Sequence, residues 1–364
     1  MAPFTHDFMS PSSSAEPALE LPIEIVRAIL LLAVGLFVEV NDRTSAVAVA
    51  LVSHAIYKLI APVLYRALVI HPRSEEQVKQ LISDEKSRLA SSFVKRLHVW
   101  NVETQSWSAG NFAWCNIELF DGTVDDLLHV LIPRATGPRH RLPASIPNTP
   151  AVPLRPRYLI LRNRLATIRP SLSRLPPESL SFVTHYTAPY ELPGEVYRHE
   201  ESAPGLLIGS VLRMLPACTH FALDCRTMNE LHFREPPPAG QRRLAPVSVA
   251  TLRRAVCAAL DLEAEPRLGP SLPGPDHPFT LATPKKKLKF VMLYIPNSAN
   301  FDPLELSHML YDVVETHTGA AGRLAVWFDN RTANTADQAY TMYTRDAICG
   351  RDVWSEARLL KEPW

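Results

Sequence analysis

Cysteine and glycine are scarce in this chain. Its 364 residues include 13 glycines and 5 cysteines. The cysteines are scattered, and no pair has the spacing of zinc ligands: Cys115, Cys218, Cys225, Cys257 and Cys349. An odd, scattered set argues against a disulfide framework and fits thiols kept in a reducing compartment. We therefore expect no metal site and no cofactor.

Long hydrophobic runs are missing as well. The apolar stretch 28–38 is closed by Arg27 and Glu39, and it is shorter than the roughly 20 apolar residues that a membrane-spanning helix needs. Residues 1–20 lack the basic and apolar parts of a signal peptide, and their serine and proline content predicts a disordered tail. We expect no membrane partner and a soluble protein of the cytoplasm, the nucleus or both.

Sequence patterns of catalysis are also lacking. No Gly-x-Ser-x-Gly sequence occurs, and Gly-Ala-Ala-Gly at 319–322 does not match a dinucleotide or phosphate loop. His308 and His317 have no metal-ligating partner close in sequence. His185 and His220 fall on or beside expected strands, where a structural histidine is more common than a general base. We expect a protein that is not an enzyme; the alternative is a hydrolase or transferase whose site is assembled from distant residues.

The segment from Leu21 to Arg66 predicts a compact helical module. Pro22 suits a first helical turn because it has no N–H to lose, and Glu24 places negative charge near the positive end of the helix dipole. Apolar residues at helical spacing follow, and 46–65 repeats the pattern up to a break expected at Pro62. A helix with so wide an apolar face needs a partner surface. The residues of its stripe are Ile25, Val26, Ile29, Leu30, Leu32 and Ala33.

At these positions the chain resembles the F-box family. The matching residues are Leu21-Pro22, Glu24-Ile25, Ile29-Leu30, Leu51-Val52-Ser53, Pro62 and Leu64-Tyr65-Arg66. The ending Leu-Tyr-Arg is similar to the divergent F-box domains common in basidiomycete fungi. A typical F-box has Val-Cys-(Arg/Lys)-x-Trp where this chain has 51–57, so Tyr57 would have to substitute for the tryptophan.

The resemblance implies a three-helix platform that binds the Skp-type adaptor of a cullin-based (SCF) ubiquitin ligase, with the rest of the chain holding a protein target. On this interpretation the chain is the non-catalytic substrate-recognition subunit. The adaptor would contact Leu21, Pro22, Ile25, Ile29, Leu30, Leu51, Tyr57, Leu64 and Tyr65. The alternative is a scaffold or binding protein outside any ligase, in which these helices only cap the core.

Beyond residue 70, short apolar runs of strand length alternate with helical patterns, which favours parallel pairing. Strands are expected at Val94–Trp100, Tyr158–Leu161, Ser181–Tyr186, Thr219–Cys225, Leu288–Ile295 and Leu324–Phe328. Helices are expected at Val124–Ile132, Leu206–Leu215, Val249–Leu262 and Pro303–Thr316. Proline, at 33 residues, gathers in 133–156, 236–246 and 266–284, and these stretches are expected to be loops.

Some of these strands have the rhythm of leucine-rich repeats, as at Leu159, Leu161 and Asn163. Genuine repeats recur every 20–29 residues or so, whereas these strands are irregularly spaced. We expect a mixed α+β or α/β fold, with an F-box-like helical module at 21–70 and an irregular leucine-rich-repeat-like array at 71–364. An ordinary α/β domain is the alternative.

Arginine provides all of the basic charge between Asp126 and Glu178, an interval without acidic residues. Guanidinium groups fork onto carboxylates and phosphates, so such a cluster suits an acidic or phosphorylated target. The residues expected to bind it are Arg155, Arg157, Arg162 and Arg164. The alternative is that these arginines pair with acidic residues elsewhere. The net charge of +1 and the lack of a recognised binding motif argue against nucleic acid.

Overall fold

The computed structural model describes fourteen stretches of the chain together with two single residues, 112 and 208. The stretches are 21–39, 42–72, 74–84, 88–100, 115–131, 155–162, 172–175, 177–189, 211–225, 249–260, 288–297 with 303–317, and 319–332 with 336–360. The expected tail at 1–20 and the loops at 236–246 and 266–284 lie outside these residues, as does 133–154 of the first proline-rich stretch.

Three helices form the N-terminal module, as expected: α1 (Ile23–Glu39), α2 (Arg43–Ala50) and α3 (His54–Leu64). Asp42 caps α2 by accepting a 3.1 Å hydrogen bond from the backbone N–H of Ser45. Ser53 caps α3 in the same way through the N–H of Ile56, at 3.2 Å. The break expected at Pro62 is wrong, because α3 continues through Pro62 to Leu64. The chain instead breaks at 51–53, where Ser53 is extended.

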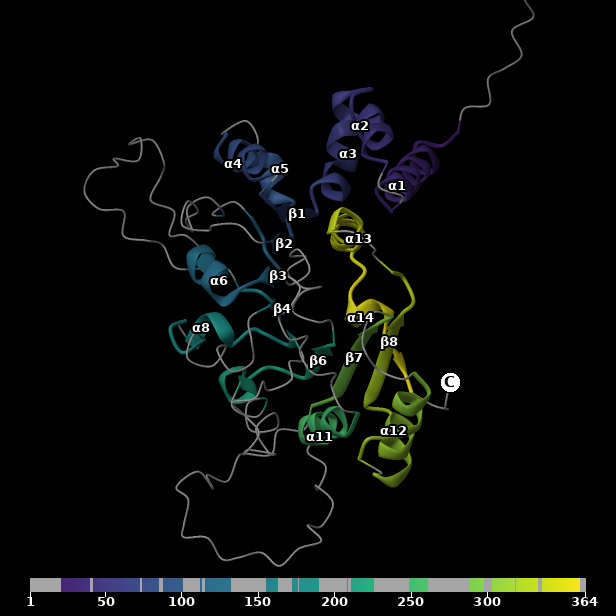
Figure 1. Cartoon of the computed structure of the whole chain (residues 1–364). Coiled ribbons are helices and arrows are strands. Elements are labelled where there is room, and N and C mark those ends of the chain that lie inside the picture. The colour runs from purple at the N-terminus through teal and green to yellow at the C-terminus, as the bar shows by residue number, and fades with distance from the viewer. Residues whose placement is uncertain are drawn as a thin grey trace, which may run out of the picture.

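The rest of the described chain is built on one nine-stranded sheet (Figure 1). The strands are β1 (Ala67–Ile70), β2 (Arg96–Val99), β3 (Leu119–Gly122), β4 (Tyr158–Leu161), β5 (His185–Pro189), β6 (His220–Asp224), β7 (Phe290–Pro296), β8 (Leu324–Asp329) and β9 (Arg358–Leu359). Each strand pairs with the strand before it in the chain, and all pairs are parallel except the last, in which β9 runs antiparallel to β8. The expected parallel pairing is therefore confirmed.

One face of the sheet carries the main apolar core. Alternate strand residues such as Leu97, Leu159 and Phe221 are fully buried there. They pack against α4 (Glu75–Ser83), α6 (Val124–Leu131), α8 (Pro177–Leu180), α11 (Val249–Leu260) and α12 (Pro303–Thr316). A short helix, α5 (Arg88–Ser92), packs beside α4.

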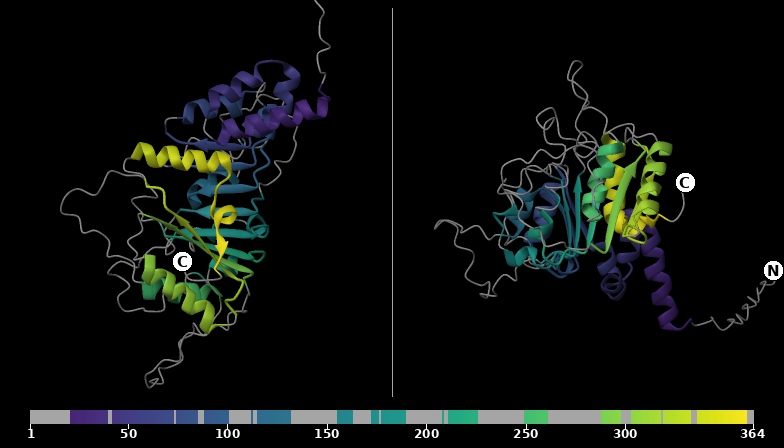
Figure 2. Two further views of the ribbon diagram at one scale, coloured as in Figure 1. Left: turned by 90° about the vertical axis from the view of Figure 1, so that its right-hand side faces the viewer. Right: turned by 90° about the horizontal axis from the view of Figure 1, so that it is seen from below.

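The other face carries polar and aromatic residues and is partly covered by the C-terminal segment, residues 336–360. This segment comprises α13 (Ala336–Cys349), α14 (Val353–Glu356) and β9. Figure 2 shows it in yellow, running from the N-terminal module across the sheet towards β8. Val353 of α14 packs with Ala222, Met292 and Ala325 of three neighbouring strands. One end of α13 reaches α1, where Ile348 packs against the small core of the N-terminal module.

Two of the expected elements, Tyr158–Leu161 and Pro303–Thr316, have the observed bounds. Six others differ from the observed elements by at most two residues at either end: Val94–Trp100, Val124–Ile132, Thr219–Cys225, Val249–Leu262, Leu288–Ile295 and Leu324–Phe328. The expected strand Ser181–Tyr186 begins too early, because β5 starts at His185. Within Leu206–Leu215, residues 208 and 211–214 are helical. All five cysteines are free thiols, as expected. No helix among the described residues combines the length and apolar character needed to cross a bilayer.

Candidate functional site

The N-terminal module exposes an unusual amount of apolar surface. Of the 13 large apolar side chains exposed in the described part of the chain, ten lie between Leu21 and Val52. Four of them follow one another along α1 at helical spacing, and we call them the α1 stripe: Ile25, Ile29, Leu32 and Leu36. Such a concentration of exposed apolar side chains is typical of an interaction surface.

The α1 stripe is exposed because α1 is apolar on more than one side. Its other side buries Val34 and Val38 in a small core with Ala46, Ala50 and Ile60 of α2 and α3. The two shorter helices, α2 and α3, cannot enclose a 17-residue helix that is apolar nearly all round. The module therefore folds on one side of α1 and leaves the other side exposed.

The structure divides the expected adaptor-binding residues into two groups. Leu21, Pro22, Ile25, Ile29 and Leu51 are exposed. Leu30, Tyr57, Leu64 and Tyr65 are partly buried. Leu32 and Leu36 were not among the expected contacts, although their spacing from Ile29 places them on the same side of α1.

Tyr57 belongs as much to the module's core as to its surface. It packs against the small core together with Leu64. Its ring meets that of Tyr65 edge to face, with 6.4 Å between ring centroids. Burial, followed by a hydrogen bond with Tyr57, raises the pKa of Tyr65 to about 12. Substitution of Tyr57 would therefore disturb packing as well as any interface.

A buried polar cluster lies where α13 crosses the sheet, and Asp121 is at its centre. The Asp121 carboxylate accepts two hydrogen bonds from Arg162, at 2.6 and 2.7 Å, and one from the Tyr343 hydroxyl at 2.9 Å. It is also hydrogen-bonded to Nδ1 of His98, at 2.9 Å. The guanidinium of Arg162 lies 4.4 Å from the Trp100 ring centroid and 4.7 Å from that of Tyr343.

This environment keeps Asp121 ionised. Burial alone would raise the pKa of Asp121, but the charge of Arg162 and the His98 hydrogen bond outweigh burial and hold the pKa well below its ordinary value. The arrangement fixes α13 on β2, β3 and β4.

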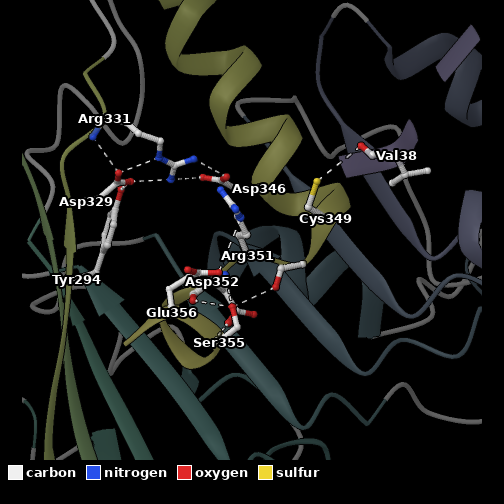
Figure 3. A network of polar contacts seen from close by, with 11 residues as sticks. Val38, Tyr294, Asp329, Arg331, Asp346, Cys349, Arg351, Asp352, Ser355 and Glu356 are labelled. Carbon is white, nitrogen blue, oxygen red and sulfur yellow. Dashed lines mark hydrogen bonds and ion pairs between the residues drawn. The ribbon is translucent and has the colours of Figure 1, made fainter. Parts of the chain in front are cut away.

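Further ion pairs attach the C-terminal segment to β8 (Figure 3). Arg331, just after β8, binds Asp329 at 2.7 Å and Asp346 of α13 at 2.7 Å. Tyr294 of β7 donates a 3.0 Å hydrogen bond to Asp329. Asp352 caps α14 through the N–H groups of Trp354 and Ser355. Polar contacts thus hold this segment along its length.

Of the four arginines expected to bind a target, the three that the structure describes do not lie together. Arg155 and Arg157 are exposed at the start of β4. Arg162 is buried at the other end of that strand, where it is bound to Asp121, and Arg164 lies outside the described residues. The alternative interpretation, in which the arginines pair with acidic residues, holds for Arg162. It also holds for the exposed Arg174, which forms an ion pair with Asp125 at 3.2 Å.

A row of stacked rings crosses the same face near the strand starts. Ring centroids lie 4.3 Å apart for Tyr158 and His185, 4.0 Å for His185 and His220, and 5.1 Å for His220 and Phe290. Burial, followed by the neighbouring His220, lowers the pKa of His185 to about 4. Trp354 of α14 meets the His185 ring edge to face. The described residues contain no cluster of three histidine, cysteine or acidic side chains that could hold a metal ion.

No family model, no curated protein and no solved structure matches the chain. The functional assignment therefore depends on the surfaces described above.

Proposed function

We propose that this chain is the substrate-recognition subunit of an SCF-type ubiquitin ligase, which binds the Skp-type adaptor through the N-terminal module and, through the adaptor, a cullin. The observation that carries the proposal is the α1 stripe. Its four exposed side chains extend over three turns of one helix and do not belong to the small core of the module. A helical face of this kind suits a helix or groove of a partner protein.

The sheet supports the second half of the proposal, a leucine-rich-repeat-like region that captures a target. Each strand lies beside its predecessor, with helices along one face, as in stacked repeats of a strand and a helix. The spacing between strands is irregular, which agrees with an irregular array. Such a fold offers strand ends and loops in a row, and we propose that the target binds among them.

Direct binding to a purified Skp-type adaptor tests the docking surface. Leu32 is 66% exposed on the α1 stripe, and Leu304 on α12 is 62% exposed. Leu32→Asp should weaken adaptor binding by about 2–3 kcal/mol, since an apolar contact is lost and a charge becomes buried. Leu304→Asp is the matched control and should change affinity by no more than about twofold. Calorimetric titration of the adaptor into each variant measures the two affinities, and equal affinities would contradict docking through the α1 stripe.

Tyr57→Ala provides a second test, because the family's tryptophan is missing. An aromatic residue central to an interface would cost about 1–3 kcal/mol of binding when truncated. The partial burial of Tyr57 adds a loss of unfolding free energy, so the titration must be done at a temperature where the variant stays folded. Unchanged affinity for the folded variant would remove Tyr57 from the interface.

One observation favours the scaffold alternative. The N-terminal module also packs against α13 through Ile348, and the thiol of Cys349 donates to the Val38 carbonyl at 3.7 Å. The three helices therefore cover one end of α13 as well as exposing the α1 stripe. If the full-length folded chain shows no binding to a Skp-type adaptor at micromolar concentration, the ligase assignment is wrong and capping is the module's role.

A further inference from the structure

A row of residues lies along the edge of the sheet where the parallel strands begin. The residue before each of β1 to β7 is joined to the next by a backbone hydrogen bond of 2.7–2.9 Å. In order across the sheet, these residues are Arg66, Lys95, Glu118, Arg157, Thr184, Thr219 and Lys289. Neighbours in the row are about 4.8 Å apart, the usual distance between strands.

Positive charge dominates this row. Its four basic residues are all exposed, and its single acidic residue, Glu118, is engaged by Lys95 at 2.9 Å. Arg155 adds a fifth exposed basic side chain beside Arg157. Within the described residues, the remaining basic side chains form no ion pair with an acidic group. We call the set Arg66, Arg155, Arg157 and Lys289 the basic edge.

Arg155 is held in a geometry suited to an anion. Its guanidinium carbon lies 4.6 Å from the ring centroid of Phe182, an exposed residue just before β5. Stacking on the ring uses the flat face of the guanidinium and leaves its N–H groups to fork onto a phosphate or carboxylate. Two residues away, Arg157 can supply a second forked contact to the same group.

Other parts of the open face of the sheet are already covered by the chain itself, which leaves this edge for a ligand. The opposite end of the open face is already occupied, since α13 covers the Asp121 cluster and α14 packs over β6 to β8. The rings near the basic edge stack on one another, so the faces between them are unavailable to nucleic-acid bases. The exposed ring of Phe182 is already stacked against Arg155, so the basic edge favours an acidic peptide over a single-stranded nucleic acid.

We propose that the basic edge binds an extended acidic peptide whose phosphorylated serine or threonine contacts Arg155 and Arg157. The proposal rests on the target-capturing role given above and adds the chemistry of the target. Arg66 and Lys289 each lie three strands from Arg157, or roughly 14 Å. An extended peptide covers that distance in about four residues. The ligand therefore carries acidic residues about four positions to either side of the phosphate.

Fluorescence anisotropy on the full chain tests this with a degenerate peptide pool. The pool fixes a central phosphothreonine and acidic residues about four positions away, and its unphosphorylated copy is the reference. Phosphorylated peptide should bind at least about tenfold more tightly than the copy, and its affinity should fall as salt rises. Inorganic phosphate is added as competitor, to separate a bare anion site from peptide recognition.

Charge reversal identifies the residues. Arg155→Glu with Arg157→Glu should lower affinity for the phosphorylated pool by roughly 100-fold or more, as two charge-assisted hydrogen-bonded contacts are lost. Arg254→Glu with Arg345→Glu makes the same charge change at exposed positions on α11 and α13 and should leave affinity within about twofold. Should the reversed variant lose its fold, the pair Arg155→Gln and Arg157→Gln gives the same test.

The outcomes are separable. Equal binding of the phosphorylated pool and its copy, or unchanged affinity after charge reversal, overturns the basic edge as a phosphopeptide site. Competition by inorganic phosphate as effective as that of the peptide reduces it to a bare anion site. Tighter binding of a single-stranded oligonucleotide assigns the edge to nucleic acid instead. Adaptor binding measured on the same variants should be unchanged, so failure here and failure of the docking proposal are distinguished.

Discussion

The Asp121 cluster allows a quantitative prediction about how the C-terminal segment is held. Arg162→Met removes the guanidinium but keeps an unbranched side chain that can pack between Trp100 and Tyr343. The Asp121 carboxylate is then left buried without its main counter-charge. Removing one partner of a buried ion pair costs about 3–5 kcal/mol of unfolding free energy. Because Asp121 keeps its hydrogen bonds with His98 and Tyr343, we expect a loss at the lower end of this range.

The pH dependence of this loss follows from the ionisation of Asp121. Its pKa is lowered in the folded protein, so the pair stabilises the fold above the ordinary carboxylate range and loses its effect only as pH falls below it. Without Arg162, burial raises the pKa of Asp121, so the folded variant takes up a proton more readily. The difference in unfolding free energy between the variant and the parent should therefore shrink as pH falls from 7 towards about 4.

Urea denaturation of a double-mutant cycle is the assay. Asp121→Asn with Arg162→Met keeps a carbonyl acceptor for Tyr343 and His98 but buries no charge, so the double variant should be more stable than the sum of the single losses predicts, by at least about 2 kcal/mol. Arg174→Met, in the exposed pair with Asp125, should cost no more than about 0.5 kcal/mol. If the losses of the two single variants add up to the loss of the double variant to within about 0.5 kcal/mol, the view that the buried pair anchors α13 is refuted.

Two further predictions concern the same face of the sheet. The pKa of His185 is lowered to about 4, so between pH 6.5 and about 4 the unfolded chain binds more protons than the folded chain. The free energy of unfolding should therefore decrease as the pH is lowered from 6.5 to about 4. His185→Phe should keep the ring stack but remove this part of the pH dependence, measured by denaturation at several pH values. Gly350→Ala should lower the free energy of unfolding by about 1–3 kcal/mol, because Gly350 has φ +74° and a Cβ there would meet the Arg96 guanidinium. Gly35→Ala, in open space on α1, should instead raise it by about 0.5–1 kcal/mol.

Much of the architecture could be predicted from local patterns. Strands such as Tyr158–Leu161 are continuous apolar runs, as expected where helices cover one face and other residues the opposite face. The helix Pro303–Thr316 carries proline at its first position and glycine beyond its end. The N-terminal helices follow a clear helical period. These signals lie within single elements and need no knowledge of distant residues.

The missed elements depend on tertiary contacts. Strand β1 is only four residues long and follows α3 directly, so its apolar residues looked like the end of a helix. The helix α13 is mostly polar, and it is secured by Tyr343 on Asp121, a residue 222 positions earlier. No local pattern reveals such a bond. For the same reason, Arg162 could not be separated from Arg155 and Arg157 before its partner Asp121 was known.

The packing of α13 on α1 and β1 has a consequence for the synthesis of the chain. The thiol of Cys349 and the carbonyl of Val38, which meet in the folded protein, are 311 residues apart in the sequence. A ribosome makes the N-terminal module and the whole parallel sheet before α13 emerges. Until then the inner end of α1 and the Asp121 carboxylate lack their final partners, and contacts so distant form slowly. The fold therefore cannot be completed until residues 336–349 have been synthesised.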